Sequence, residues 1–390
     1  MRITVSSQEL SSIVVKLQPV LMDRKMGYVG VRAHLDQSLE GMNGTLQLNA
    51  SDAHMDLYAQ VNCMVQGVGE CFIAARLFTE IVKQLPTGEV GLSIEENALV
   101  VRVFENTQFQ MKLPLIDKFS WLEEPHLNDV TTVKLETQAL SYLTSQVITA
   151  VGLDSAYIYS EVGYFHHIDG HLRLVATDSV RLSYSQMPCD IGACDIDESF
   201  LKEGICIARK GLMVMQKMAD HDGETIDFSL SAQQDMCSMS VPGFKVFIRL
   251  SYAAYPHYMS VLLNEDTPGL FKVNISRELF LGTMRRILLV SPQIPIVQLS
   301  FFESQLTISS QNKESWGKEV MELSTSFPQK IEIGLHGTGI IDVLSHLAGT
   351  HVILTVLGRH APFVIYALEE PYGCHSRHVF APVDEQYGTS

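Results

Sequence analysis

Alternating apolar and polar residues form a sixteen-residue pattern in the middle of the chain. Residues 171–186 read HLRLVATDSVRLSYSQ, with apolar side chains at alternate positions on both sides of a polar turn at 177–179. This arrangement predicts a β-hairpin. The pattern occurs first 126 residues earlier, at 45–60 (TLQLNASDAHMDLYAQ), with six of sixteen positions identical, and a weak third copy starts at Gln305. A chain that repeats itself at this interval is expected to be a set of similar domains.

A second pattern, a short strand followed by a helix, opens three segments of similar length. Near the N-terminus, alternation at 3–5 precedes Leu10, Ile13 and Leu17, which keep the spacing of one helix face. Equivalent patterns begin near Val133 and Val273, and a further helix follows later in each segment. The expected helices fall within residues 7–25, 75–85, 136–149, 209–219, 276–290 and 336–348.

These repeats predict an α+β fold of three tandem domains, each with two helices packed on antiparallel sheets. Strand-helix alternation also occurs in parallel α/β sheets, but paired strands with short turns between the helices favour antiparallel sheets with helices on one face. The pattern lapses at 115–129 and 251–269, where aromatic, acidic and proline residues indicate linkers. The expected domains are therefore 1–125, 126–266 and 267–390.

The charge is unevenly distributed along the chain. Its formal net charge is −16, which taken alone argues against nucleic acid. The six helical windows, however, hold eleven basic and six acidic residues, so they carry +5 and the remainder carries −21. This asymmetry favours one surface that binds a polyanion, mainly through phosphates and without regard to sequence. The alternative is that helix faces collect basic residues in any protein, and the windows 136–149 and 336–348 contain none.

No motif for catalysis, a metal or a cofactor is present. Phosphate-cradling, nucleophile-elbow and zinc-protease motifs are missing, and the seven cysteines lack CxxC spacing, as expected for reduced thiols. His166 and His167 alternate across a strand, and the acidic run 195–198 lacks EF-hand spacing. Arg209 and Lys210 open a helix, where an anion site and a solvated turn are both compatible with the sequence. Without a signal peptide or a membrane-spanning run, we expect a cytoplasmic protein that does not contact a membrane.

Three tandem copies, both hairpins, CIARKGLMVMQKM at 206–218 and YPHYMSVL at 255–262 together resemble the bacterial sliding clamp family, the beta subunit of DNA polymerase III. The resemblance runs from Met1 to about Asp384. It implies a head-to-tail homodimeric ring, with the helices around the hole and the sheets at the rim. It also implies a non-catalytic processivity factor that encircles duplex DNA, is placed there by a clamp loader, and tethers the replicative polymerase and other clamp-motif proteins. A paralogue restricted to repair or to replication of a mobile element is the alternative within this fold.

The resemblance assigns three groups of residues. Duplex contacts are expected at Arg24, Arg76 and Tyr157, with Arg209 and Lys210 as additions, and ring closure is expected at Phe109, Leu289 and Val290. The partner-peptide pocket is expected at Tyr159, Thr177, Ser179, Val180, Arg181, Leu182, Pro256, Val261, Val379, Phe380, Ala381, Pro382 and Val383. For Leu182 and Val261, plain core packing is the alternative.

The sequence departs from the family pattern at several of these positions. Ser179 and Val180 replace the family's Gly-His in the turn, and Ala381 and Asp384 replace a methionine and an arginine near the C-terminus. Arg24 is not followed by the family's Pro-Ile-Leu, and Pro295 stands about where the family often has a phenylalanine. These changes leave the affinity for the usual partner motif open. In the first hairpin, residues 55–56 are Met-Asp instead of Arg-Leu, so the second copy alone is expected to carry the pocket.

Overall fold

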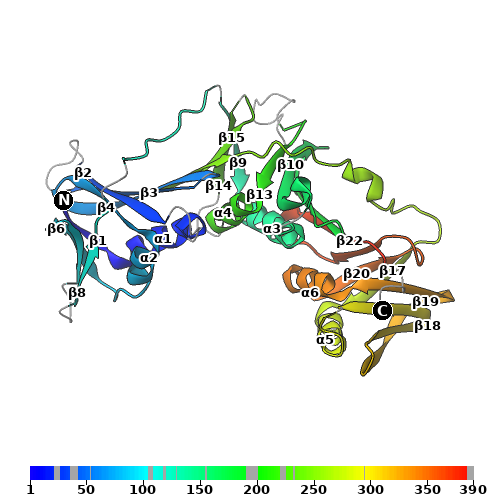
Figure 1. Cartoon of the computed structure of the whole chain (residues 1–390). Helices are drawn as coiled ribbons and strands as arrows, with labels where there is room; N and C mark the ends of the chain where they lie inside the picture. Colours follow the sequence, from blue (N-terminus) through cyan, green and yellow to red (C-terminus); the bar gives the residue numbers. More distant parts are fainter. Residues whose placement is uncertain are drawn as a thin grey trace. The chain divides into compact units, whose positions relative to one another are not determined.

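The computed structural model consists of two compact units (Figure 1). Unit 1 combines residues 1–137 with 213–250, and unit 2 combines 138–212 with 251–390. The residues that the structure describes are 1–21, 27–35, 43–52, 54–103, 109–116, 120–128, 130–153, 156–189, 201–219, 225–231, 233–293 and 295–383. Arg24 and Asp384 lie outside the described residues.

The six expected helices are present within the predicted windows. Apolar residues at helical spacing face the core, and Leu10, Val14 and Leu17 of the first helix are completely buried. Ser276 caps the fifth helix by accepting a hydrogen bond from the backbone N–H of Leu279 at 3.4 Å. The helices are α1 (Ser7–Leu21), α2 (Ala75–Lys83), α3 (Thr137–Val147), α4 (Arg209–Ala219), α5 (Arg277–Leu288) and α6 (Gly337–His346).

Unit 1 is built on a twelve-stranded sheet with α1 and α2 packed beside each other on it (Figure 1). The main strand order is β8-β7-β6-β1-β4-β16-β15-β14-β9, and β2, β3 and β5 continue the sheet from β4. Its strands are β1 (Arg2–Ser6), β2 (Tyr28–Leu35), β3 (Asn43–Ser51), β4 (Met55–Gly67), β5 (Gly69–Ala74), β6 (Glu89–Glu95), β7 (Ala98–Val103), β8 (Phe109–Pro114), β9 (Val130–Glu136), β14 (Thr225–Ser231), β15 (Met236–Val241) and β16 (Phe244–Arg249).

Unit 2 contains an eight-stranded sheet and a separate two-stranded sheet. The order β13-β10-β11-β12-β22-β21-β20-β17 joins strands far apart in the chain, and α5 and α6 pack against each other (Figure 1). Its strands are β10 (Val162–Ile168), β11 (His171–Thr177), β12 (Arg181–Pro188), β13 (Ile205–Ala208), β17 (Phe271–Ser276), β20 (His351–Val356), β21 (Phe363–Ala367) and β22 (His375–Phe380), with β18 (Ile296–Gln311) and β19 (Trp316–His336) in the second sheet.

The two predicted hairpins fold in the same register. Gln47 lies opposite Gln60 in β3–β4, and Arg173 lies opposite Gln186, 126 residues later, in β11–β12. The weak third copy at Gln305 falls in β18, where Leu306 is fully buried. Every strand pair in the described residues is antiparallel, so the predicted α+β fold with antiparallel sheets is confirmed.

Long-range strand pairing decides where the two units divide. β16 joins β4, and β22 joins β12, so each sheet combines strands from two of the expected segments. The compact units therefore split the expected middle segment, 126–266, between them. The three boundaries drawn from the sequence remain a prediction.

Candidate partner-binding and nucleic-acid surfaces

The turn between β11 and β12 is held by its own polar side chains. Asp178 accepts hydrogen bonds at Oδ1 from the N–H groups of Val180 (3.1 Å) and Arg181 (2.9 Å). Thr177 donates from Oγ1 to the carbonyl of Arg181 at 2.7 Å. Ser179 has φ +75°, in the left-handed region that glycine adopts most readily, which fits the glycine that the family resemblance leads us to expect here. The Asp178 turn thus keeps its shape although serine replaces glycine.

The Arg181 side chain turns into unit 2 and ties three elements together. It pairs with Asp178 at 3.0 Å and Asp342 at 3.2 Å, and it donates to the carbonyls of Gly339 (3.1 Å) and Thr149 (2.5 Å). A side chain at Gly339 would crowd it, because a Cβ there would lie 3.0 Å from Nη1. Only 11% of the Arg181 side chain is exposed. This arginine is therefore a structural connector between the turn, the end of α3 and α6.

The structure brings the hairpin together with the C-terminal strand. Leu182 lies opposite Val379, and Arg181 lies opposite Phe380, in the β12–β22 pair. The chain continues alongside the turn, because the N–H of Ala381 donates to the carbonyl of Val180 at 3.0 Å. Leu182 and Val379 share a buried apolar cluster with Val175, Tyr258 and Val364. We call this region, where β12 pairs with β22 around the Leu182–Val379 cluster, the second junction.

The linker adds the outer part of the second junction. Tyr258 is buried, and its hydroxyl contacts His166 Nε2 at 2.9 Å and Arg173 Nη1 at 3.0 Å. Burial lowers the pKa of His166 to about 4. Pro256 is exposed and 47% of Val261 is exposed, so apolar groups remain available at the surface.

The remaining predicted pocket residues occupy different positions around this cluster. Tyr159 is half-buried and stacks on Tyr157 with ring centroids 5.4 Å apart. Phe380 is almost fully buried in a separate core with the third-segment residues, so its side chain serves packing. Pro382 and Val383 are half-buried, and the N–H of Val383 donates to the carbonyl of Gly334 at 2.8 Å.

The corresponding junction of unit 1 has different chemistry. Asp56 occupies the position that Leu182 has in the second copy, and it lies opposite Phe247. The Asp56 carboxylate is buried, pairs with Arg249 at 2.7 Å and accepts a hydrogen bond from Ser51 at 2.5 Å. A buried carboxylate paired with a partly exposed arginine, in place of a leucine, cannot provide the same apolar floor.

The predicted DNA-contact residues that the structure describes belong to both units and differ in exposure. Arg76 is exposed on α2, and 55% of Tyr157 is exposed. Arg209, by contrast, is half-buried and donates from Nη1 to the carbonyls of Ile148 and Val151, both at 2.7 Å. Burial, reinforced by the charge of Arg181, lowers the Arg209 pKa. Arg209 holds the end of α3, and Lys210 beside it is half-buried.

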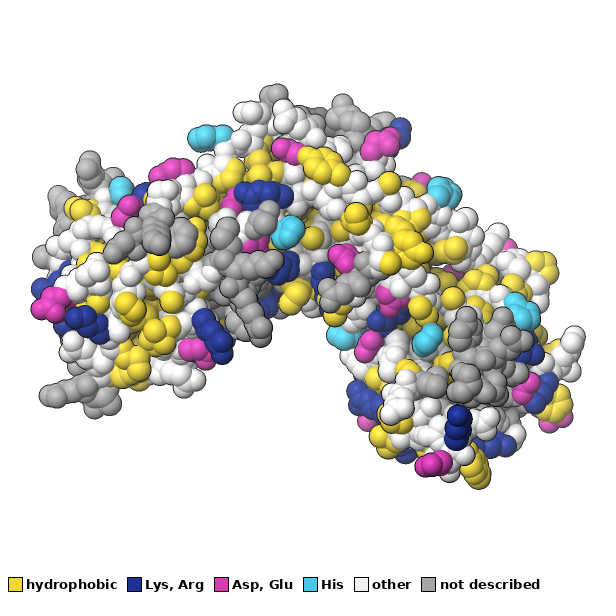
Figure 2. Space-filling model, viewed as in Figure 1, with side chains coloured by type: hydrophobic (Ala, Val, Ile, Leu, Met, Phe, Trp, Pro, Cys, Tyr) yellow, Lys and Arg dark blue, Asp and Glu magenta, His cyan; other side chains and the backbone are white. Residues whose placement is uncertain are grey.

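A groove in unit 1 is lined by three lysines that the family resemblance did not assign to DNA contact. Lys16 of α1, Lys83 at the end of α2 and Lys217 of α4 all line it. The other lining residues carry no acid: Ser7, Gln8, Ser11, Ser12, Val15, Val82, Leu85 and Thr87. The face drawn in Figure 2 instead shows Lys and Arg side chains interspersed with Asp and Glu. The excess of basic residues in the helical windows was the sequence signal for this groove.

Two helical arginines of unit 2 already have partners within the protein. Arg286 of α5 pairs with Glu319 at 2.6 Å. Arg277 donates to the carbonyls of Leu344 and Gly349 at 3.0 and 2.9 Å. Counting charges along the helices therefore overestimates how many can meet a polyanion.

The expected ring-closure residues lie on an edge strand of unit 1 and directly after α5 in unit 2. Phe109 begins β8, which is the last strand at one end of the main strand path in unit 1. Leu289 follows α5 directly and is 78% exposed, and Val290 is half-buried. An edge strand has unpaired backbone groups that can join another chain.

The described residues offer few features of a metal, redox or membrane site. Among the described residues, no group of three His, Cys, Asp or Glu side chains could hold a metal ion. The six described cysteines are buried thiols. No helix in the described part of the chain is both long and apolar enough to cross a membrane.

Comparison with known proteins agrees with this architecture. A family model described as the N-terminal domain of the DNA polymerase III beta subunit matches residues 1–121. The beta sliding clamp of Caulobacter vibrioides is 23% identical over 358 residues, which cover 90% of this chain and 91% of that protein. The N-terminal third of the chain thus matches the DNA polymerase III beta subunit, and nine-tenths of the chain is similar in sequence to a beta sliding clamp.

Other clamp relatives are similarly distant in sequence. The Escherichia coli K12 beta sliding clamp is 26% identical over 318 residues, covering 79% of this chain and 81% of that clamp. The solved DNA polymerase III beta subunits of Thermotoga maritima and Pseudomonas aeruginosa have TM-scores of 0.83 and 0.80, each at 19% identity. They cover 98% of this chain, and 99% and 100% of their own chains. The clamp fold therefore extends over nearly the whole chain.

Proposed function

We propose that this chain is a DNA sliding clamp, a processivity factor without chemistry of its own. It encircles duplex DNA as a head-to-tail homodimer and tethers the replicative polymerase. The observation that carries this proposal is the second junction, where a linker, a hairpin and the C-terminal strand meet around Leu182 and Val379. Similarity to beta sliding clamps over most of the chain also supports it.

The duplex is held through phosphate contacts that do not read sequence. Lys16, Lys83 and Lys217 line a groove without acidic side chains, and Arg76 is exposed on α2, the helix that ends at Lys83. Tyr157 adds an exposed aromatic ring. Such contacts weaken with salt, because each neutralised phosphate releases counterions. Arg209 contributes indirectly by holding the end of α3.

Partners bind at the second junction through a short linear motif with apolar anchors. Buried Leu182 and Val379 form the floor, while exposed Val180, Pro256 and Val261 form the rim. Anchors that fill such apolar sites usually dominate binding energy. The clamp loader and polymerase are the expected users of this site, and the cytoplasm is the expected location.

Retention on circular DNA tests the proposal directly. Protein loaded on nicked circular plasmid with a clamp loader should remain bound at high salt and should leave after the plasmid is linearised. An electrostatic binder would leave both DNAs, because its affinity falls steeply with salt. Equal release from circular and linear DNA at high salt would refute encirclement.

Charge reversal tests the DNA surface. Replacing both Lys83 and Lys217 by glutamate should lower the amount retained on circles at moderate salt. Replacing both Lys313 and Lys318 by glutamate is the matched control, because these exposed lysines of the β18–β19 hairpin do not line the lysine groove. Equal losses in the two proteins would show that net charge, and not the groove, controls retention.

The departures at the second junction favour a specialised clamp as the second candidate. Ala381 is exposed where the family usually has methionine, and Ser179 and Val180 replace Gly-His in the turn. A clamp for repair or for a mobile element would bind the host polymerase motif weakly. Its gene would be expected beside such a system and not beside a replication initiator.

A further inference from the structure

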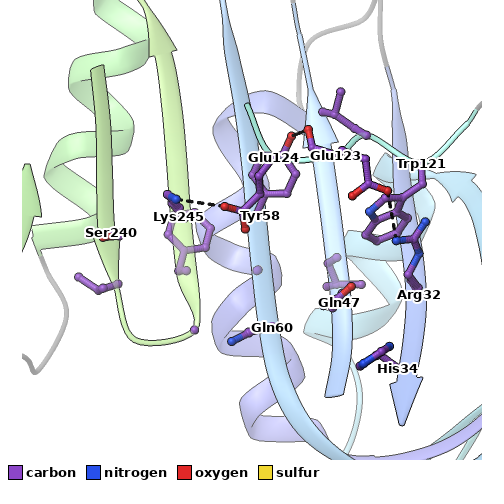
Figure 3. A pocket seen from close by; sticks show the side chains of 16 residues that line it. Arg32, His34, Gln47, Tyr58, Gln60, Trp121, Glu123, Glu124, Ser240 and Lys245 are labelled. Carbon is purple, nitrogen blue, oxygen red and sulfur yellow. Dashed lines mark hydrogen bonds and ion pairs between the residues drawn. The ribbon is translucent and has the colours of Figure 1, made fainter. Parts of the chain in front are cut away.

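Unit 1 contains a junction built like the one proposed to bind partners. Residues 121–124, which we call the strap, are irregular and contact side chains of β2, β3, β4 and β16 (Figure 3). The Arg32 guanidinium lies 4.0 Å from the Trp121 ring centroid. Asn49 donates to the Leu122 carbonyl (3.2 Å), Tyr58 donates to the Glu123 carbonyl (2.8 Å) and Lys245 pairs with Glu124 (3.0 Å).

Strand register shows that the two junctions are equivalent. Tyr58 lies opposite Lys245, and Tyr184, 126 residues after Tyr58, lies opposite Arg377. Both cations pair with a linker glutamate: Lys245 with Glu124 and Arg377 with Glu265, each at 3.0 Å. The same framework therefore positions both linkers.

The first junction has an open cavity beside its linker. This cavity measures about 500 Å³, within the usual size range of ligand pockets. Gln47 and Gln60 lie directly opposite each other and line it, with His34 and Lys245 also among the lining residues (Figure 3). Within the described residues, the side-chain amides of Gln47 and Gln60 have no hydrogen-bond partner.

The lining chemistry suits an extended acidic peptide. Paired glutamine amides offer donors and acceptors that match a peptide backbone. Arg32, His34 and Lys245 can attract a carboxylate, while the strap acids Glu123 and Glu124 have 80% and 52% of their side chains exposed. Those two acids can turn outward at little cost.

The strap itself shows what this surface recognises. Its Trp121 ring stacks on the Arg32 guanidinium, and its Glu124 carboxylate pairs with Lys245. Two of its backbone carbonyls accept hydrogen bonds from side chains of the sheet. Within the described part of the chain, none of its four backbone N–H groups donates a hydrogen bond. An extended segment lying alongside could pair with them, as in β-strand addition.

We propose that the cavity beside the strap is a second peptide-docking site, for an extended segment with an acidic side chain next to an aromatic one. Its contacts would be the amides of Gln47 and Gln60 for the backbone, and Lys245 and His34 for the carboxylate. The proposal rests on the proposed function in one respect, because it takes the second junction as a peptide site. A protein partner would then have two attachment points of different chemistry on one chain.

Tryptophan fluorescence provides the test, since Trp121 and Trp316 are the two tryptophans of the chain. In Trp316→Phe protein, the blocked peptide acetyl-Ser-Phe-Asp-Glu-Ser-amide should cause a saturable change in Trp121 emission. The same peptide with lysines replacing both acids should bind about tenfold or more weakly, a difference of about 1.4 kcal/mol. Lys245→Glu and Gln60→Ala should each weaken binding, and Gln60→Ala does so without removing any strap contact.

The control variant is Val261→Glu, which alters the exposed rim of the second junction. It should leave the Trp121 response unchanged. A response equal for acidic and basic peptides, no saturable response, or a loss in Val261→Glu with full binding in Lys245→Glu would each overturn the proposal. None of these results would alter retention on circular DNA, so the test separates this inference from the clamp function.

Discussion

Ser179 adopts a backbone conformation that most residues avoid. Its φ of +75° costs an L-residue roughly 1–2 kcal/mol, and a β-branched side chain tolerates it least. Ser179→Val should therefore lower the free energy of unfolding by about 1–2 kcal/mol, measured by urea denaturation. Ser179→Gly should be at least as stable as the native protein. Equal stability of the valine and glycine variants would show that the turn adapts without strain.

Two buried histidines make stability depend on pH. Burial lowers the pKa of His166 to about 4 and that of His378 to about 3, below the value of about 6.5 for an exposed histidine. Between about pH 6.5 and 4 the unfolded chain binds more protons, so stability should fall as the pH drops through this window. The contribution of His166 to this loss in the free energy of unfolding is on the order of 2 kcal/mol between pH 7.5 and 5. His166→Gln should remove that contribution. His360→Gln, which alters an exposed histidine, should leave the slope unchanged.

Arg181 connects elements that the chain places far apart. Its contacts with Asp178, Thr149 and Asp342 join the turn to the end of α3 and to α6. Arg181→Ala leaves these polar groups without their partner, and should destabilise the protein by about 2–4 kcal/mol. Lys112→Ala, which removes an exposed pair with Glu96, should cost less than about 1 kcal/mol. If Arg181→Ala and Lys112→Ala had equal midpoints in thermal unfolding, Arg181 would not have this connecting role.

Local patterns predicted the elements, but contacts between distant residues decided what several side chains do. The helices and hairpins follow from alternation and helical spacing, which are properties of neighbouring residues. Arg209 was selected as a DNA contact, yet it is occupied by the carbonyls of Ile148 and Val151. The pairing of Leu182 with Val379 spans almost two hundred residues, so only the family resemblance could suggest it.

At the scale of the whole molecule, the sequence repeats and the compact units have different boundaries. The repeats consist of a hairpin and two helices, whereas the units form where strands pair most extensively. Because β4 pairs with β16 and β12 with β22, each junction is a continuous sheet. Each junction is also crossed by a linker that an ion pair anchors. One framework thus carries a charge pair at Asp56 and an apolar cluster at Leu182.

Ring closure provides the last prediction. Leu289 is 78% exposed in the single chain, so a charge there should not disturb the fold of the protomer. If Leu289 is buried between protomers, Leu289→Asp places an unpaired charge in that interface and should shift dimer to monomer in sedimentation velocity. Leu368→Asp is the control, because Leu368 is 49% exposed and was not assigned to the interface. Unchanged thermal unfolding would show that the protomer is intact. A Leu289→Asp protein that still sediments as a dimer would place ring closure elsewhere, and would free β8 to pair with a different edge.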